Sequence, residues 1–170
     1  MSSAQHIQKS QDTGESGERR FYDSCRAAGK DIKKTKKGDD MHRHTDFLVE
    51  GASFDVKGLK QSQSEGRIIL EVLNVQGKMG WCNHKKKPEW IAFDFGGFFL
   101  CAKNEDLYDI TQDFCQLKDK VSNIKDSLYK GYTRKNRKDL MTTVLLQDVL
   151  EDCEHWFLPY KQYRAPMELL

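Results

Sequence analysis

Three carboxylates and a lysine lie within residues 42–60 at positions that a β-hairpin would bring to one side. Side chains alternate between the faces of a strand, so Asp46 and Glu50 on one strand share a face with Asp55 and Lys57 on the next. Converging carboxylates repel one another unless a divalent cation holds them, and oxygen ligands suit Mg²⁺ or Mn²⁺. Such an ion polarises a phosphoryl oxygen and lowers the pKa of a bound water. The pattern therefore predicts a metal-dependent catalytic site, with an ordinary charged strand face as the alternative.

The hairpin is predicted from two short runs, rich in aromatic and β-branched residues, on either side of Gly51-Ala52. If Gly51 and Ala52 are the two turn residues, Asp46 faces Lys57 across the strands. The opposite face carries only apolar side chains and is expected to join the core: Phe47, Val49, Phe54 and Val56.

The order of these residues resembles a known family. Asp46, followed after a short turn by Asp55-Val56-Lys57, is similar to the Asp…(Asp/Glu)-x-Lys core of the PD-(D/E)xK nuclease superfamily. Thr45 stands where the family usually has proline. The resemblance implies a restriction-endonuclease-like fold and a nuclease dependent on Mg²⁺ or Mn²⁺, more as an endonuclease than as an exonuclease. In that interpretation Asp46, Asp55 and the Val56 carbonyl hold metal, while Lys57 orients water and stabilises charge.

Two flanking segments extend the resemblance. Residues 17–22 open an expected helix, as the acidic helix does in archaeal Holliday-junction resolvases and related enzymes. Residues 68–75 resemble the core strand that follows the lysine, and we expect this strand beside the Asp55–Lys57 strand, with Glu71 on the face opposite to Ile68 and Leu70. Glu18 and Glu71 are accordingly expected to be supporting catalytic carboxylates, and Glu71 a further metal ligand. The alternatives are a helix-start carboxylate for Glu18 and a buried salt bridge for Glu71.

The charge distribution bears on the partner. Net charge is only +2, so no global basic field indicates nucleic-acid binding. Basic residues are clustered, however, at 30–37, 85–87 and 134–138. The candidate phosphate contacts are His44, Lys60, Lys78, Arg134 and Lys135. DNA is favoured over RNA. An RNA endonuclease of the same fold, or a non-catalytic nucleic-acid or protein-binding module that keeps the fold, is the alternative.

The remaining sequence sets the expected organisation. Residues 1–16 lack periodicity and are expected to be a flexible tail, while residues 17–170 form one α/β domain. Its mixed sheet of about five strands includes residues 68–75 and a hairpin around Gly96-Gly97, with Asp94 inside it as a structural group. Helical periodicity is seen from residue 105 onward and over residues 140–156.

The sequence also bears on the cellular location, the state of the cysteines and the oligomeric state. No apolar run is long enough to span a bilayer, and no signal peptide is seen, so a cytoplasmic or nuclear location is expected. The five cysteines, an odd number without close pairs, are expected to be reduced thiols. Many proteins of the resembling type act as dimers, so a homodimer is expected, although the sequence shows no dimer face.

Overall fold

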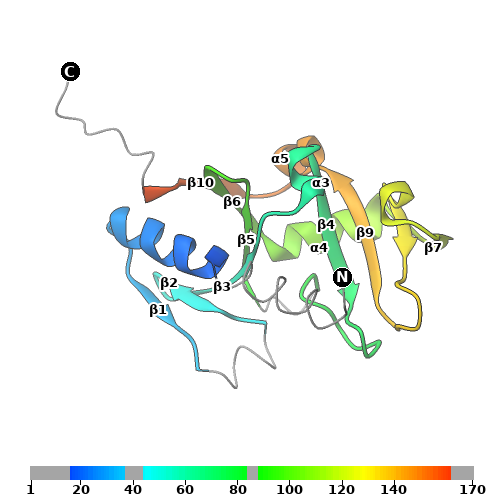
Figure 1. The fold of residues 1–170 in the computed structure, drawn as a ribbon, viewed down its shortest axis with the longest axis horizontal. Coiled ribbons are helices and arrows are strands. Elements are labelled where there is room, and N and C mark those ends of the chain that lie inside the picture. The colour runs from blue at the N-terminus through cyan, green and yellow to red at the C-terminus, as the bar shows by residue number, and fades with distance from the viewer. Residues whose placement is uncertain (1–15, 37–43, 84–87, 162–170) are drawn as a thin grey trace, which may run out of the picture.

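Two β-sheets and the helices that flank them make up the fold, which a computed structural model describes for residues 16–36, 44–83 and 88–161 (Figure 1). Sheet A has the strand order β1 (Ile32–Lys34), β2 (Phe47–Val49), β3 (Ala52–Lys57), β5 (Trp90–Asp94), β6 (Phe98–Lys103) and β10 (His155–Pro159). Sheet B has the order β4 (Arg67–Leu73), β9 (Leu140–Leu145), β8 (Lys130–Tyr132) and β7 (Gln116–Val121).

Both sheets are mixed. β1, β2 and β3 form an antiparallel meander, and β3 then pairs with β5 in parallel. In sheet B, β7 and β8 are parallel while β4 and β9 are antiparallel. The helices are an N-terminal helix over residues 16–27, α3 (Gln61–Ser64), α4 (Asn104–Asp113), α5 (Leu146–Asp152) and the 3₁₀ turn η1 (Ile124–Asp126). The prediction of an α/β domain with a mixed sheet and flanking helices is confirmed at this level, with two sheets in place of one.

The N-terminal helix covers one face of sheet A. Phe21 and Cys25, one helical turn apart, are fully buried against Phe47 and Phe54 of the hairpin. The helix ends at Gly29, whose φ of 72° is readily adopted by glycine, and backbone bonds back to Cys25 and Arg26 satisfy its last carbonyls. The structure describes the predicted 1–16 tail only from residue 16, which is already helical.

The other face of sheet A packs against sheet B and α4. Ile91 and Leu100 of sheet A join Ile68 and Val144 of sheet B and Leu107 of α4 in one apolar cluster. Alternate strand residues on sheet A therefore serve two different cores, one under the N-terminal helix and one under sheet B. This arrangement puts the polar face of the β2–β3 hairpin on the side of sheet B.

The hairpin turn differs from the prediction by one residue. β2 and β3 pair Phe47 with Phe54 and Val49 with Ala52, so the turn residues are Glu50 and Gly51. Both have positive φ, 49° and 83°, as a type I′ turn requires, and this turn suits the twist of the flanking strands. The pairing register shifts by an even number of residues, so the strand side chains keep their predicted faces. Glu50, predicted to share the face of Asp46, lies in the turn instead, and its carboxylate accepts the Asp31 N–H at 2.9 Å.

Two other predictions about elements are wrong. Residues 140–156, expected to be one helix, form β9, α5 and β10 in succession. Strand β4 was expected beside the Asp55–Lys57 strand, but it pairs with β9 in sheet B. The β-branched residues Thr142, Thr143 and Val144 are all buried, as on a strand covered on both faces, and β-branched residues favour a strand over a helix.

Asp94 is structural, as predicted. Its carboxylate forms an ion pair of 2.8 Å with Arg20 and accepts hydrogen bonds from the Tyr160 hydroxyl and the Gly96 N–H. Burial, together with Asp94, raises the pKa of Tyr160 to about 12. The carbonyl of Asp94 accepts from Gln63, so one buried residue joins the N-terminal helix, β5, α3 and the segment after β10.

Candidate active site

Asp46, Asp55 and Lys57 meet on the polar face of the hairpin. Asp46 lies just before β2, and its Oδ2 accepts the backbone N–H of Val56 at 2.7 Å. Asp55 is 5% exposed, and its Oδ2 lies 2.8 Å from Nζ of Lys57. The two carboxylates and the ammonium are thus held by strand pairing rather than by a mobile loop.

Lys57 is enclosed by opposite charge and an aromatic ring. Its ammonium lies 4.9 Å from the ring centre of Trp81, in a cation–π contact. Burial alone would lower the pKa of Lys57, but the carboxylates of Asp55, Asp46 and Glu71 outweigh burial and raise the pKa above its usual value of 10.5. Lys57 is therefore positively charged at neutral pH, which suits it to stabilise negative charge rather than to accept a proton.

Glu71 reaches this group from the other sheet. It projects from β4 on the face opposite to the buried Ile68 and Leu70, as its parity predicted. Burial raises the pKa of Glu71, and the nearby charges of Lys57, His44 and Arg134 only partly offset this effect. Sequence placed Glu71 near Lys57 for the wrong reason, because the two are brought together across sheets and not by neighbouring strands.

A cavity of about 410 Å³ opens beside Lys57 and Glu71. Its wall comes from both sheets, from α3 and from η1. The lining residues are Lys57, Lys60, Gln63, Ile69, Glu71, Trp81, Phe93, Ile124, Tyr132, Arg134 and Met141. Cationic, carboxylate and aromatic side chains therefore share one recess next to the paired aspartates.

Arg134 is the cavity cation that is most firmly positioned. Its Nε donates to the carboxylate of Asp139, and its backbone N–H donates to the same carboxylate at 2.9 Å. Asp139 is 1% exposed, so the ion pair is anchored in the protein. Sequence named Arg134 as one residue of an exposed basic loop but gave no sign of this anchor.

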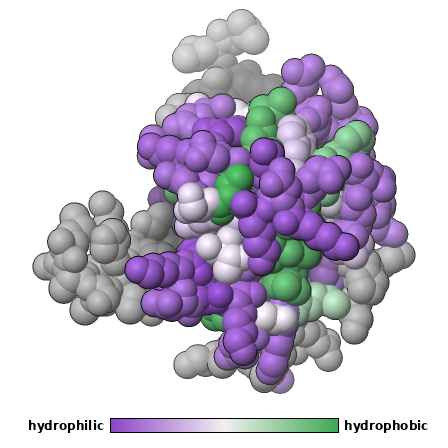
Figure 2. Space-filling view, turned by 90° about the vertical axis from the view of Figure 1, so that its right-hand side faces the viewer, coloured by the Kyte–Doolittle hydropathy of each residue, from purple (hydrophilic) through white to green (hydrophobic). Residues whose placement is uncertain are grey.

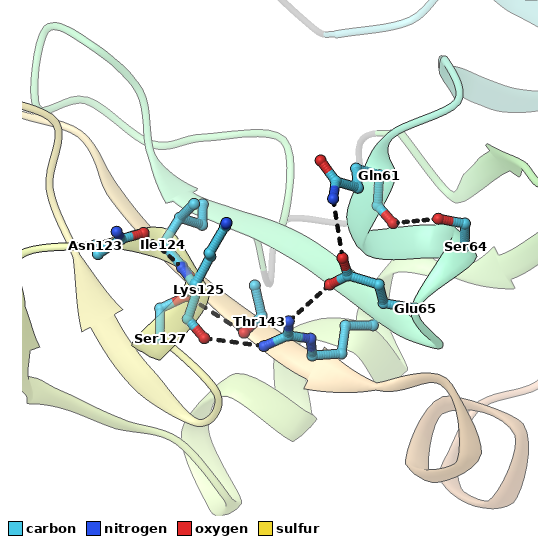
Figure 3. A network of polar contacts seen from close by, with 9 residues as sticks. Gln61, Ser64, Glu65, Asn123, Ile124, Lys125, Ser127 and Thr143 are labelled. Atoms are coloured by element: carbon cyan, nitrogen blue, oxygen red, sulfur yellow. Dashed lines mark hydrogen bonds and ion pairs between the residues drawn. The ribbon is translucent and has the colours of Figure 1, made fainter.

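A polar network joins α3 and β4 to η1 (Figure 3). Arg67 donates to the carboxylate of Glu65 at 2.8 Å and to the carbonyl of Lys125 at 3.0 Å. Glu65 also accepts from Gln61 of α3 at 3.1 Å. The segment from α3 to the start of β4 is in this way fixed to η1, which contributes Ile124 to the cavity wall.

Divalent-metal binding can be judged from the donors present. Among residues 16–36, 44–83 and 88–161, no group of three or more His, Cys, Asp and Glu side chains lies close enough to hold an ion. Asp55 Oδ2, however, is buried, and its partner is the Lys57 ammonium at 2.8 Å. Mg²⁺ commonly takes only one or two carboxylates and keeps several waters. Asp46 and Asp55 suit that smaller donor set, with Glu71 across the cavity.

The other residues named from sequence are more scattered. Glu18 lies on the helix that covers the opposite face of sheet A, and its carboxylate pairs with Lys34 at 3.2 Å. The side chain of Val56 belongs to the core under that helix. His44 lies near enough to affect the pKa of Glu71, and Lys60 lines the cavity. The structure therefore does not bring Glu18 to the cavity group.

Lys78 and Lys135 lie outside the cavity, on neighbouring loops of sheet B. The loop after β4 contacts the loop before β9, where the N–H of Lys138 donates to the Val75 carbonyl at 3.3 Å. Both candidate lysines are exposed. Figure 2 views this end of the molecule and shows a largely hydrophilic surface with small hydrophobic areas. The basic cluster at 85–87 lies outside the described residues.

No protein-family model, curated protein or solved structure matches the chain. No helix among the described residues is long and apolar enough to cross a bilayer. The function therefore has to be inferred from the geometry and charge of the site.

Proposed function

We propose that this chain is a metal-dependent nuclease of the PD-(D/E)xK type that hydrolyses phosphodiester bonds in DNA. One observation carries the proposal: Asp55 pairs with the Lys57 ammonium at 2.8 Å, and the carboxylates of Asp46 and Glu71 also raise the pKa of Lys57, beside a cavity lined by Lys60 and Arg134. Carboxylates gathered beside a recessed ammonium favour the binding of a cation.

The chain's own residues have distinct roles in this reaction. During hydrolysis a water oxygen bonds to phosphorus, the bond from phosphorus to the leaving oxygen breaks, and that oxygen takes up a proton. Lys57, charged and held by Asp55, orients the water and stabilises the negative charge that grows on the phosphoryl oxygens. Glu71 accepts a hydrogen bond from water in the cavity. Arg134 binds a neighbouring phosphate.

Asp46, Asp55 and the Val56 carbonyl would hold Mg²⁺ or Mn²⁺. When bound, such an ion supplies a Lewis acid for the phosphoryl oxygen and lowers the pKa of a coordinated water. The type and spacing of the residues support this role, since carboxylate and carbonyl oxygens are what these ions prefer. The choice of DNA and the restriction-endonuclease-like fold rest on the sequence resemblance.

A binding-only module is less well supported. Such a module gains nothing from clustering carboxylates that repel one another and also repel nucleic-acid phosphates. The raised pKa of Glu71 indicates that burial of its charged form is unfavourable for folding. Sites that are kept at the expense of stability are more often functional than structural.

The test is a cleavage assay on labelled single-stranded DNA, duplex DNA and RNA of one sequence, at fixed ionic strength. Each substrate is incubated with Mg²⁺, with Mn²⁺ or with EDTA. Metal-dependent cutting of DNA supports the proposal. Cutting of RNA alone would reassign the substrate. A lack of cutting of all three substrates, with no Mn²⁺-dependent rise in melting temperature, would favour the binding module.

A further inference from the structure

The aspartates of the proposed site are recessed rather than displayed on a groove. Asp46 is 7% exposed and Asp55 is 5% exposed. The Lys57 side chain, 2.8 Å from Asp55, is 29% exposed and forms part of the cavity wall. Lys57 is therefore the member of this group that a phosphate in the cavity can meet.

The size of the cavity limits what can enter. A volume of 410 Å³ corresponds to a sphere roughly 9 Å across and lies within the range of about 300–1,000 Å³ for small-ligand sites. The major groove of B-DNA alone is about 12 Å wide. A double helix is thus too broad for this recess, whereas one nucleotide with its base turned out of a stack is not.

The lining has the two kinds of group that a nucleotide needs. Aromatic rings of Trp81, Phe93 and Tyr132 supply apolar wall, and the cations of Lys60 and Arg134 supply phosphate partners. Trp81 is already covered on one side by Lys57 and packs edge-on against Phe93. Tyr132, which is partly exposed on β8, is the ring that remains for stacking a base.

We propose that the cavity accepts a single unstacked nucleotide of single-stranded DNA, with its base against Tyr132 and a phosphate at Arg134. The inference rests on the proposed nuclease function and specifies its substrate as single strands, including the unpaired ends of duplexes. Asp139 fixes the Arg134 guanidinium, so this phosphate partner is preorganised before substrate binds.

Binding is measured first, without metal, so that no cleavage occurs. A fluorescent oligothymidylate of six nucleotides is titrated with full-length protein in EDTA, and its anisotropy gives Kd. Tyr132→Ala is expected to weaken binding by about fivefold to a hundredfold, the range for loss of one base–aromatic stack. Arg134→Ala is expected to weaken binding and to reduce its salt dependence.

Two control variants keep the comparison specific. Lys103→Ala removes one positive charge at an exposed ion pair on sheet A, and Phe114→Ala removes an exposed ring beyond α4. Both are expected to bind within twofold of wild type. Equal loss of binding in controls and cavity variants would overturn the assignment of the cavity. Circular dichroism melting of each variant identifies any that fail to fold, and Tyr132→Leu then replaces Tyr132→Ala.

The second arm uses Mn²⁺ and three DNAs of one sequence: a single strand, a blunt duplex, and a duplex with an unpaired tail. Cleavage confined to single-stranded regions is the expected result. Equal cleavage of the blunt duplex would overturn the inference and leave the nuclease intact. Tight oligothymidylate binding through Tyr132 without any cleavage would reject the nuclease and retain the cavity as a binding site.

Discussion

Replacing Lys57 with methionine should make the protein less stable and more responsive to metal. The substitution removes the ammonium that lies 2.8 Å from Asp55 and leaves the charges of Asp55, Asp46 and Glu71 without the cation with which all three interact. Removal of one partner of a fully buried ion pair destabilises by about 3–5 kcal/mol. Since Lys57 is 29% exposed, solvent reduces this penalty, and we expect a loss of about 2–3 kcal/mol.

Thermal melting in EDTA and in Mn²⁺ measures both effects. For a chain of this length about 1 kcal/mol changes the melting temperature by about 2–4 °C, so Lys57→Met should melt about 4–12 °C lower in EDTA. Mn²⁺ at a hundredfold excess over its Kd adds about 2.7 kcal/mol. Mn²⁺ at that excess should therefore bring Lys57→Met close to the melting temperature of the wild type in EDTA. At one Mn²⁺ concentration the variant should gain more than the wild type, because it lacks the ammonium that competes with the ion. Cleavage stays abolished because the group that orients water is missing.

The matched control is Lys103→Met, which breaks an exposed pair with Glu154 at 2.9 Å. It should lose no more than about 1 kcal/mol, as exposed pairs do, and should melt with the wild-type response to Mn²⁺. If Lys57→Met melts at the wild-type temperature in EDTA, or if its loss is unaffected by Mn²⁺, the picture of three carboxylates competing for one cation is wrong.

Three further outcomes are expected. Asp94→Asn should lose about 2–4 kcal/mol in urea unfolding, because it leaves Arg20 without its carboxylate; a loss below about 0.5 kcal/mol would contradict the structural role of Asp94. Glu71→Gln should raise the melting temperature at pH 7 but not at pH 4. Burial raises the pKa of Glu71, so the wild type loses stability as pH rises through that pKa, and the neutral glutamine avoids this loss. An equal rise in melting temperature at both pH values would contradict this linkage. Burial raises the pKa of all five thiols: that of Cys25 and that of Cys153 to about 12, and those of Cys82, Cys101 and Cys115 in the same direction. A thiol reagent at pH 8 should therefore react much more slowly with the folded protein than with the protein in denaturant. Rapid labelling of the folded protein would refute this prediction.

The sequence predicted the face of the hairpin better than its register. Strict alternation separates Phe54 and Val56 from Asp55 and Lys57 whichever residues form the turn. The predicted turn begins at Gly51, whereas the structure begins it at Glu50, which has a positive φ. A difference of one residue in the turn shifts the pairing by two, so Asp55 and Lys57 stay on the same face as Asp46.

The pairing of strands that are far apart in the chain could not be predicted from the sequence. β4 pairs with β9, which begins about seventy residues later, and no local pattern specifies that partner. Residues 140–156 contain apolar side chains at spacings that fit a helix, and short apolar runs do not distinguish helix from strand. Tyr132 was likewise passed over, since its place in the cavity depends on how sheet B folds against sheet A.

The measurement that tests the central claim most directly is the rate of single-stranded DNA cleavage at increasing Mn²⁺ for wild type, Asp55→Asn and Asp119→Asn. Asp119 is an exposed carboxylate on β7 that pairs with Lys130, so its variant controls for the loss of one negative charge. Wild type and Asp119→Asn should cleave with the same Mn²⁺ dependence, and Asp55→Asn should be at least a hundredfold slower, about 2.7 kcal/mol in activation free energy. Cleavage by Asp55→Asn within threefold of wild type, or cleavage that persists in EDTA, would contradict the assignment of the carboxylate–lysine group as the active site.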